Sequence, residues 1–447
     1  MLFYLMRNKL ILISDDANYN YQVVKIMKLQ LAYGKKYLPL ELAEDWDVEV
    51  IEAPPTSMNR SGPQLIEHAL HNPIGTSRLE EIIKRKSARN AVIVVNDITR
   101  PTPYALILPP LLEKIEQAGI SSEDITLIIA TGIHRHHTPA DNQEVFGEEI
   151  CRRYKIINHN CDDDLVSIGT LSNGMELIIN RTAAETDLLI TTGVVGLHYF
   201  AGYSGGRKSI LPGIAARQVI EANHKMMSDT RARLGNYEDN PVSDLMIEAA
   251  QMAEVDFILN VVTHGKKEIA FCAAGDLKQA WLEAVKFCEG LNTVKIKQQA
   301  DVVVASCGGY PKDINMYQAQ KALDAAVLAV KPGGTIILAA ECREGLGEET
   351  FQKWIESSSC PQDIFDRFNS HFELGGHKAY AICRILEHAQ ILLLSALPDP
   401  VVRSLFMAPV PSLEEALAMV RVKYGTQASL IIMPEAPKIA VKLVGHA

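Results

Sequence analysis

The chain has 447 residues, more than a single hydrophobic core usually holds, so we expect two domains. Hydrophobic residues make up 47% and charged residues 22% of it, a composition typical of globular proteins with a sizeable core. The formal net charge of −10 argues against a nucleic-acid-binding protein, because neutralising phosphates requires clustered Lys and Arg. A small molecule is the expected partner.

Eight cysteines are scattered along the chain without a CxxC pair, a pattern typical of reduced, mostly packed thiols in a cytoplasmic protein. The apolar start, residues 1–14, is interrupted by polar residues, lacks a following cleavage site and is too short to span a membrane. Residues 15–21 are polar, and the alternation of a strand begins only at Met27. We therefore expect residues 1–26 to be an extension that is disordered or lies outside the true start of the protein.

From Met27 onwards, β-type segments alternate with helical ones. Strands are predicted at residues 28–34, 48–53, 91–97, 125–132, 155–160 and 187–195, and helices at residues 61–70, 106–119 and 141–154. This alternation predicts a doubly wound, Rossmann-like α/β sheet, and ligands of such sheets gather at the carboxyl ends of the strands.

The second half of the chain repeats this pattern. Helices are predicted at residues 277–291 and 313–330, and strands at residues 300–311, 331–341 and 389–396, the first of which runs into a Gly-rich turn. We expect two α/β domains with an active-site cleft between them. The expected parts are an N-terminal domain at residues 27–294, a C-terminal domain at residues 295–432, and a tail at residues 433–447 that packs back on the N-terminal domain.

Polar residues follow two of the predicted strands in the first half. Asp97 and Arg100 come at the end of the strand AVIVVND, and His134 follows the strand ITLIIATG. Because the carboxyl ends of parallel strands share one edge of a sheet, these side chains are expected to lie close together. Three further histidines are interpreted as loop or packing residues: His136, His137 and His159.

Residues 192–224 form a glycine-rich stretch in which two histidines, His198 and His224, flank one amine, Lys208. Its glycines can adopt conformations closed to other residues, so that backbone N–H groups can approach an anion closely. The stretch differs from a phosphate-binding P-loop because Arg207 stands where the second glycine of GxxxxGK[ST] should be. Nucleoside triphosphates are therefore disfavoured as ligands.

In the second half, Tyr317, Gln318 and Lys321 stand near the start of the helix predicted at residues 313–330. All three can face a cleft if the helix begins there. A solvated helix start is an equally good interpretation of the same residues.

Together, the segments ITRPTP, ATGIHRHHT, HYFAGYSGGRKSILPG, ANH and GGYPKDINMYQAQK resemble the nickel-dependent lactate racemase family of 2-hydroxyacid racemases and epimerases. The resemblance covers nearly the whole chain from Met27. It implies an isomerase that moves a hydride from the substrate to a cofactor and back, with a planar 2-oxo acid formed in between.

The resemblance also implies roles for single residues. Lys208 corresponds to the lysine that binds a nickel-pincer nucleotide (pyridinium-3-thioamide-5-thiocarboxylic acid mononucleotide) covalently, and His224 corresponds to the protein ligand of the nickel. His134 and His198 correspond to two histidines that alternate as acid and base on opposite faces of the substrate. Three further residues are assigned to the cofactor site: Asp97, Gly205 and Gly206.

Arg100 and Lys321 correspond to residues that bind the substrate carboxylate or stabilise the oxyanion, with Tyr317 and Gln318 beside them. The expected partners are lactate or a related 2-hydroxy acid and the enzymes that make the cofactor, but no nucleic acid and no membrane; homo-oligomerisation is left open. Two alternatives remain. One is a metal-dependent lyase or hydrolase that uses His134, His198 and His224 directly, and the other is a non-catalytic nucleotide- or anion-binding protein.

Overall fold

The computed structural model describes residues 11–13, 22–24, 26–43, 45–54, 60–265 and 268–444. The chain forms two compact units. The continuous unit comprises residues 55–291, and the discontinuous unit combines the segment up to Pro54 with the segment from Asn292 onwards. Both are α/β units built on parallel strands, which confirms the predicted fold class.

The continuous unit is built on a six-stranded sheet. In spatial order its strands are β15 (Glu268–Gly275), β14 (Phe257–His264), β11 (Leu189–Val194), β6 (Ala91–Asn96), β7 (Ile125–Ala130) and β8 (Lys155–Asn158). All neighbouring pairs are parallel except β14 and β15, which form an antiparallel hairpin at one edge. The chain builds outward through β6, β7 and β8 and then returns to the other side of β6 with β11, so the strand order reverses between β6 and β11.

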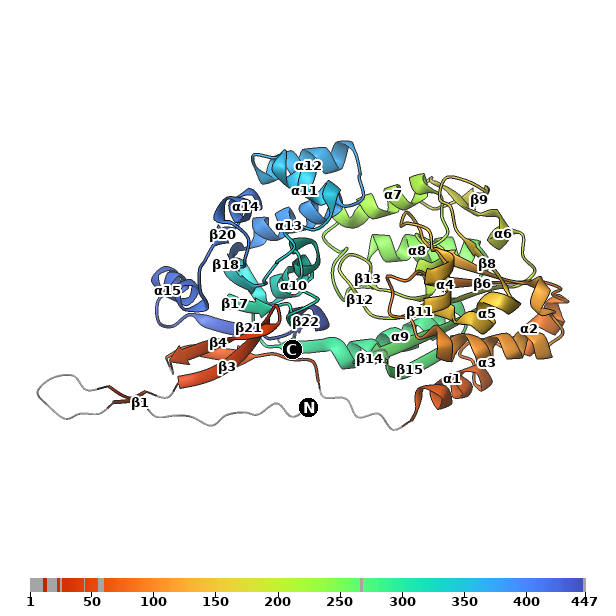
Figure 1. Ribbon diagram of the computed structural model, residues 1–447, viewed down its shortest axis with the longest axis horizontal. Helices are drawn as coiled ribbons and strands as arrows, with labels where there is room; N and C mark the ends of the chain where they lie inside the picture. Colours follow the sequence, from red (N-terminus) through yellow and green to blue (C-terminus); the bar gives the residue numbers. More distant parts are fainter. Residues whose placement is uncertain are drawn as a thin grey trace, which may run out of the picture. The chain divides into compact units, whose positions relative to one another are not determined.

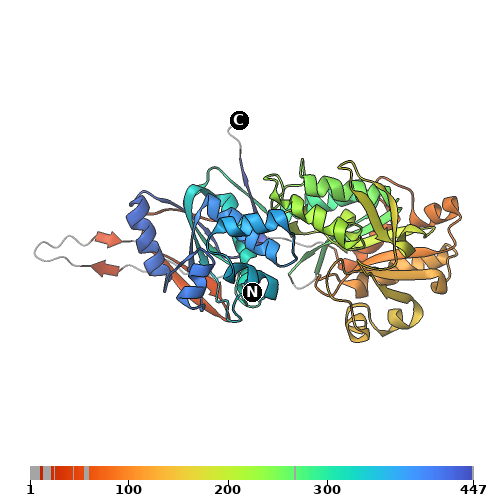
Figure 2. The same cartoon turned by 90° about the horizontal axis from the view of Figure 1, so that it is seen from above.

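Helices cover both faces of this sheet, as Figure 1 shows with α1, α2 and α3 below it and α7 and α8 above it. Figure 2 shows α7 and α8 in green, side by side. The α-helices of this unit are α1 (Gly62–His71), α2 (Leu79–Lys86), α3 (Tyr104–Gln117), α4 (Pro139–Phe146), α5 (Glu148–Arg153), α6 (Arg181–Ala184), α7 (Arg217–Lys225), α8 (Pro241–Met252) and α9 (Leu277–Asn292). The 3-10 helices are η1 (Ser122–Asp124), η2 (Gly206–Ser209) and η3 (Met226–Ser228).

Burial explains why these strands form the centre of the unit. In β6, the five residues AVIVV are buried, as expected for a parallel strand covered on both faces. Ile93 and Val95 pack into the core shared with α1, α2 and α3. Two small antiparallel pairs complete the unit: β9 (Leu165–Thr170) with β10 (Glu176–Asn180), and β12 (Leu197–His198) with β13 (Gly202–Tyr203).

The discontinuous unit has a second six-stranded sheet, and all its pairs are parallel. In spatial order its strands are β20 (Ala408–Pro409), β19 (Gln390–Leu394), β18 (Val330–Ala339), β17 (Ala300–Ser306), β21 (Ser429–Met433) and β5 (Asp47–Val50). Its helices are α10 (Met316–Ala329), α11 (Glu349–Glu356), α12 (Pro361–Ser370), α13 (Gly376–His388), α14 (Asp399–Ser404), α15 (Leu413–Tyr424) and η4 (Ala436–Lys438).

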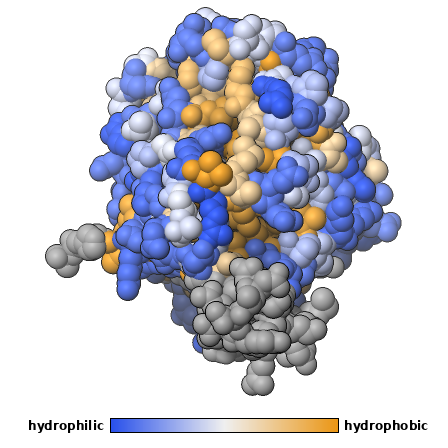
Figure 3. Space-filling view, turned by 90° about the vertical axis from the view of Figure 1, so that its left-hand side faces the viewer, coloured by the Kyte–Doolittle hydropathy of each residue, from blue (hydrophilic) through white to orange (hydrophobic). Residues whose placement is uncertain are grey.

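The antiparallel hairpin of β3 (Ile26–Tyr33) and β4 (Lys36–Ala43) covers one face of this sheet together with α15. Leu31 and Leu40 of the hairpin pack into the same core as Val304 of β17 and Ile432 of β21. On the face shown in Figure 3, hydrophilic residues surround a broken band of hydrophobic ones, an ordinary surface for a globular protein.

The domain boundaries differ from the sequence prediction at both ends. Residues 27–54 were assigned to the N-terminal domain, but β5 pairs with β21 and this segment belongs to the discontinuous unit. In the tail, β22 (Ala440–Leu443) pairs with β16 (Thr293–Ile296) of the discontinuous unit. Both pairings join segments far apart in the sequence, which local patterns do not reveal. The predicted extension at residues 1–26 lies largely outside the described residues, apart from Ile26 and the paired β1 (Ile11–Ile13) and β2 (Gln22–Val24).

All eight cysteines are free thiols, and six of them are buried, as their spacing predicted. No helix in the described parts of the chain has the length and apolar character needed to cross a membrane.

Candidate functional site

The predicted site residues of the first half lie at the carboxyl edge of the sheet in the continuous unit. Asp97 and Arg100 follow β6, His134 follows β7, and His198 ends β12, which follows β11. The strand order reverses between β6 and β11, and ligands of open α/β sheets bind outside the carboxyl ends of the strands at such a switch point. The topology therefore brings these residues to the place where a ligand is expected.

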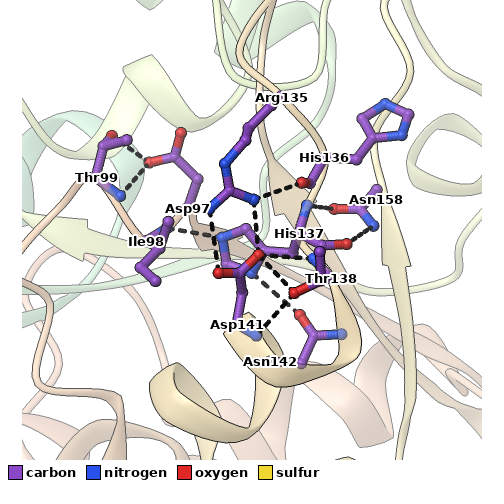
Figure 4. Close-up of polar contacts among 10 residues, drawn as sticks. All are labelled: Asp97, Ile98, Thr99, Arg135, His136, His137, Thr138, Asp141, Asn142 and Asn158. Atoms are coloured by element: carbon purple, nitrogen blue, oxygen red, sulfur yellow. Dashed lines mark hydrogen bonds and ion pairs between the residues drawn. The ribbon is translucent and has the colours of Figure 1, made fainter.

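Asp97 is only 4% exposed and forms a close pair with His134. Its Oδ2 lies 2.6 Å from Nδ1 of His134. Its Oδ1 accepts hydrogen bonds from the hydroxyl and the backbone N–H of Thr99, which Figure 4 shows. Burial alone would raise the pKa of Asp97, but the hydrogen bonds from His134 and Thr99 outweigh it and hold the pKa below its usual value. The carboxylate is therefore ionised and fixes the proton of His134 on Nδ1, which leaves the lone pair of the neutral ring on Nε2.

His198 has the opposite arrangement. Its Nδ1 accepts a hydrogen bond of 3.2 Å from the backbone N–H of Ala201 in the turn between β12 and β13. The neutral ring must therefore carry its proton on Nε2. The two neutral rings therefore present opposite groups at Nε2, a lone pair on His134 and an N–H group on His198.

Phe200, which the sequence did not single out, connects three of the predicted residues. Its ring centroid lies 4.6 Å from that of His198 and 5.1 Å from that of His224, and 5.5 Å from Nζ of Lys208. The two histidines and the lysine therefore surround one buried aromatic ring. Its signal in the sequence was its place in HYFAGY, directly beside His198.

Lys208 lies in η2, directly after the glycine pair. Burial, together with the nearby positive charges of Arg207 and Arg100, lowers the pKa of its amine well below the ordinary value for lysine. A lysine with a lowered pKa has a larger neutral fraction at physiological pH, and the neutral amine is the nucleophilic form.

Arg207, the residue that breaks the P-loop pattern, is a structural group. It is 1% exposed, its guanidinium stacks 3.8 Å from the ring centroid of Trp281, and it donates hydrogen bonds to Ser243 of α8 and to the carbonyl oxygens of Ala201 and Tyr203. Burial lowers its pKa to about 9. The arginine therefore binds the glycine loop to α8 and α9.

The two loop glycines are required by close packing, which differs from the anion cradle suggested by the sequence. Gly205 has a φ of +81°, and a Cβ there would lie 2.5 Å from the Val195 side chain and 2.6 Å from Oδ1 of Asn260. The backbone N–H of Gly206 donates to the same Asn260 oxygen at 2.7 Å. This N–H group therefore has a protein partner and is not directed at an anion.

His224 is a buried imidazole on α7. Its Nδ1 donates to the carbonyl oxygen of Ile220 one turn earlier, at 2.9 Å, which places the lone pair on Nε2. Burial and the nearby Lys208 lower its pKa to about 3, so the ring is neutral at physiological pH. Metal-binding histidines usually have this arrangement, with one nitrogen hydrogen-bonded to a carbonyl oxygen and the other directed at the metal.

The remaining predicted histidines have contacts within the fold. His159 is fully buried after β8, its Nε2 lies 3.0 Å from the carbonyl oxygen of Ala215, and burial lowers its pKa to about 4. This matches its interpretation as a packing residue. His136 is exposed, whereas His137 is buried and hydrogen-bonded.

The other three predicted site residues lie in the discontinuous unit, on the first turns of α10 after β17. The helix begins at Met316, where Asn315 caps it through the backbone N–H of Gln318, three residues later than predicted. Nζ of Lys321 donates to Oε1 of Gln318 at 2.7 Å, and burial together with Glu348 raises the pKa of Tyr317 to about 12.

One alternative interpretation needs three imidazoles that converge on a metal ion. In the parts of the chain that the structure describes, no group of three or more His, Cys, Asp or Glu side chains is arranged to hold one. A metal at His224 would need donors from elsewhere, such as a cofactor that brings its own.

Comparison with known proteins identifies relatives of this chain. The sequence profile of the lactate racemase N-terminal domain matches residues 33–235, and that of the lactate racemase C-terminal domain matches residues 295–441. A lactate racemase of Thermoanaerobacterium thermosaccharolyticum is 36% identical over 425 residues, which cover 93% of this chain and 99% of the relative. A lactate racemase of Lactiplantibacillus plantarum is 34% identical over 428 residues, which cover 93% of this chain and 100% of the relative.

Solved structures give the same result. The structure of the lactate racemase apoprotein from Thermoanaerobacterium thermosaccharolyticum matches with a TM-score of 0.85 at 35% identity, covering 93% of this chain and 100% of that one. A protein of Thermotoga maritima matches with a TM-score of 0.61 at 19% identity over 88% of this chain, a likeness that shows the fold alone. The two profiles span most of the chain, and both lactate racemase sequences align over nearly their whole length. The chain belongs to the lactate racemase family.

Proposed function

We propose that this isomerase racemises a small 2-hydroxy acid, with lactate as the first candidate. Family membership supports the reaction class. The observation that carries the proposal is the arrangement around Phe200, where a lysine of lowered pKa and a neutral imidazole lie against the same buried ring as His198.

The residues present fit a nickel-pincer nucleotide. Lys208, with its enlarged neutral fraction, would form the covalent thioamide, and Nε2 of His224 would be the protein ligand of the nickel. When bound, the cofactor would supply the acceptor for the substrate hydride. One histidine as the protein ligand of the nickel is the arrangement expected if the cofactor supplies the remaining donor atoms.

His134 and His198 would handle the hydroxyl proton of the substrate. The protonation forms set by their hydrogen bonds are complementary, since His134 has its lone pair and His198 its proton on Nε2. In these forms Nε2 of His134 can accept the hydroxyl proton, and Nε2–H of His198 can donate a hydrogen bond to the substrate oxygen. As a proton donor, either ring would act as the imidazolium. A racemase needs both functions, because the two enantiomers present the hydroxyl from opposite faces.

Asp97, which the resemblance assigned to the cofactor site, is proposed to orient His134. Its ionised carboxylate lies 2.6 Å from Nδ1, fixes the ring orientation, and stabilises the imidazolium that forms when Nε2 takes a proton. Arg100 and Lys321 are proposed to bind the substrate carboxylate or stabilise the oxyanion, with Tyr317 and Gln318 beside Lys321. Both cations are exposed, and exposed cationic side chains are suitable partners for a carboxylate.

The covalent attachment can be tested by intact-protein mass spectrometry on protein produced together with the cofactor-making enzymes. Wild-type protein is expected to carry the mass of the nucleotide, and the Lys208→Ala variant is expected to lack it, because the variant has lost the amine proposed to form the thioamide. Lys225→Ala, at an exposed lysine of α7, is the matched control and should keep the added mass. An unmodified wild-type Lys208 in fully active protein would contradict the proposal.

A further inference from the structure

His137 lies outside the residues to which the family resemblance gives a role, yet it is 6% exposed and three residues from His134. Both nitrogens of its ring have partners. The backbone N–H of Ile98 donates to Nε2 at 2.7 Å, and Nδ1 lies 3.0 Å from Oδ1 of Asn142 on α4. The ring therefore bridges the loop after β6 and the first turns of α4.

These contacts fix the protonation form of the ring. The amide of Ile98 can only donate, so Nε2 of His137 must be an acceptor without a proton. The neutral ring then carries its proton on Nδ1 and donates it to Asn142. A proton on Nε2 would face the amide hydrogen of Ile98, so this position favours the tautomer with the proton on Nδ1.

The backbone of His137 is fixed as well. Its N–H donates to Oδ1 of Asn158 at 2.8 Å, and Nδ2 of Asn158 donates to its carbonyl oxygen at 3.1 Å (Figure 4). Asn158 is the last residue of β8, so these two bonds tie the backbone of His137 to the sheet. The ring of Phe146 packs beside it, with the centroids 6.2 Å apart.

The bond to Ile98 acts on the peptide group that joins Asp97 to Ile98. Fixing the plane of this peptide restricts the backbone of Asp97, whose carboxylate in turn contacts His134 at 2.6 Å. Without an acceptor at Nε2, the Ile98 amide would be left without this partner in a part-buried position, which favours rearrangement of the turn.

We propose that His137 is a positioning residue for the reaction. It holds the turn at Asp97 against the loop of His134, so that the Asp97 carboxylate meets Nδ1 of His134 and leaves Nε2 directed at the substrate. The step from position to catalysis rests on the proposed function of His134. A displacement of about 1 Å in such a group can cost on the order of 100-fold in rate.

Two substitutions at His137 test the hydrogen bonds of its two ring nitrogens separately. In His137→Gln, the side-chain oxygen can reach the place of Nε2 and still accept from Ile98. In His137→Asn, the side-chain amide can reach the place of Nδ1 and still donate to Asn142, but nothing reaches Ile98. With enzyme carrying its cofactor, we expect kcat of His137→Asn to fall by roughly 10- to 100-fold with little change in KM. We expect the kcat of His137→Gln to stay within about threefold of the wild-type value. The kcat of His136→Asn, a substitution at the exposed neighbouring residue, should equal the wild-type value.

Crystal structures of the same variants make the test independent of activity. The contact between Asp97 and His134 should persist in His137→Gln and lengthen in His137→Asn. Persistence of the contact in His137→Asn, or equal kcat in both variants, would overturn the proposal. If wild-type protein with its cofactor racemises nothing, the proposed function fails, and the crystal structures still decide whether the contact depends on His137.

The protonation form can be measured without any substitution. Nitrogen-15 NMR of wild-type protein should show the tautomer of His137 with its proton on Nδ1. A proton on Nε2 would contradict the proposal even if both variants failed to fold.

Discussion

Burial favours the uncharged forms of both Lys208 and His224. Burial is the largest cause of the lowered pKa at both residues, and the proximity of Lys208 lowers the pKa of His224 further. A neutral imidazole is a metal ligand and a neutral amine is a nucleophile, so the same environment prepares both for their proposed roles. The sequence identified these residues through their motif, but it could not show the environment that gives them this chemistry.

Replacing Asp97 tests the proposed orientation of His134 at the scale of one residue. In Asp97→Asn the side chain keeps its size but loses the charge that stabilises protonated His134. We expect kcat of the enzyme with its cofactor to fall by roughly 100-fold or more, with KM changed much less. Steady-state kinetics on both enantiomers of lactate would measure this effect.

The matched control is Asp162→Asn, at an exposed carboxylate that pairs with Arg217. It should leave kcat close to wild type. An equal effect of the two substitutions would show that the charge of Asp97 has no special role.

At the residue scale, the sequence predicted which residue types would gather at the sheet edge but not their hydrogen-bond partners. The protonation forms of His134 and His198 depend on Asp97 and on the backbone N–H of Ala201. The ring of Phe200 was missed because an aromatic residue beside a histidine carries no distinctive signal in one sequence. Contacts of this kind follow from the folded chain and not from spacing.

Among the elements, the glycine loop differs most from its prediction. The sequence suggested a phosphate cradle, whereas the structure shows Gly205 packed against Val195 and Asn260, and Arg207 buried against Trp281. In the sequence, the only signal that this loop packs against other elements was the cation Arg207 within a run of small residues. Its partners come from β14, α8 and α9, far along the sequence, so the signal could not be interpreted further.

Central parallel strands were predicted well because β6 and β7 are short, almost continuous apolar runs. The edge hairpin of β14 and β15 was missed, since polar residues such as Asn260 and Thr263 interrupt β14. The helix predicted at residues 141–154 is divided into α4 and α5, because Gly147 adopts a positive φ of 84° between them. Local sequence therefore predicted the continuous apolar strands β6 and β7 and the edge strands β8 and β5, but not this hairpin.

His159 follows β8, and its ring contacts the carbonyl oxygen of Ala215, which follows η2. Because the ring is buried, we expect the stability of the protein to depend on pH. Its pKa is about 4 in the folded protein, below the ordinary value of about 6.5 in an unfolded chain. The unfolded state therefore binds more protons between these values, and stability is fully present above pH 6.5 and falls as the pH is lowered towards 4. The loss from this one group should be on the order of 3 kcal/mol.

Urea unfolding of wild-type protein and of His159→Gln at several values of pH between 7 and 4 would measure this contribution. Glutamine does not titrate, so the free energy of unfolding of the variant should fall less steeply with decreasing pH. Parallel curves for the two proteins would show that His159 does not titrate on unfolding.

At the scale of the whole molecule, two α/β units were predicted and found, but the path of the chain through them was not. The chain enters the discontinuous unit with β3, β4 and β5, leaves it for residues 55–291, and returns at Asn292. The pairing of β5 with β21 joins residues nearly 400 positions apart. Such a pairing depends on tertiary contacts that hydrophobic periodicity does not encode.

The predicted site residues are divided between the two units. Those proposed for cofactor and proton handling belong to the continuous unit, and Tyr317, Gln318 and Lys321 belong to α10 of the discontinuous unit. The sequence predicted both groups through the family resemblance. The hydrogen bond between Lys321 and Gln318 is an addition from the structure.

Racemase activity can be tested by incubating enantiomerically pure lactate with protein that carries its cofactor and following both enantiomers by chiral chromatography. Starting from either enantiomer, the reaction is expected to end at equal amounts of the two, and a His134→Ala, His198→Ala double variant should abolish the conversion. Lactate that stays enantiomerically pure with protein shown by mass to carry the nucleotide, with the same result for other small 2-hydroxy acids, would contradict the proposed racemase activity.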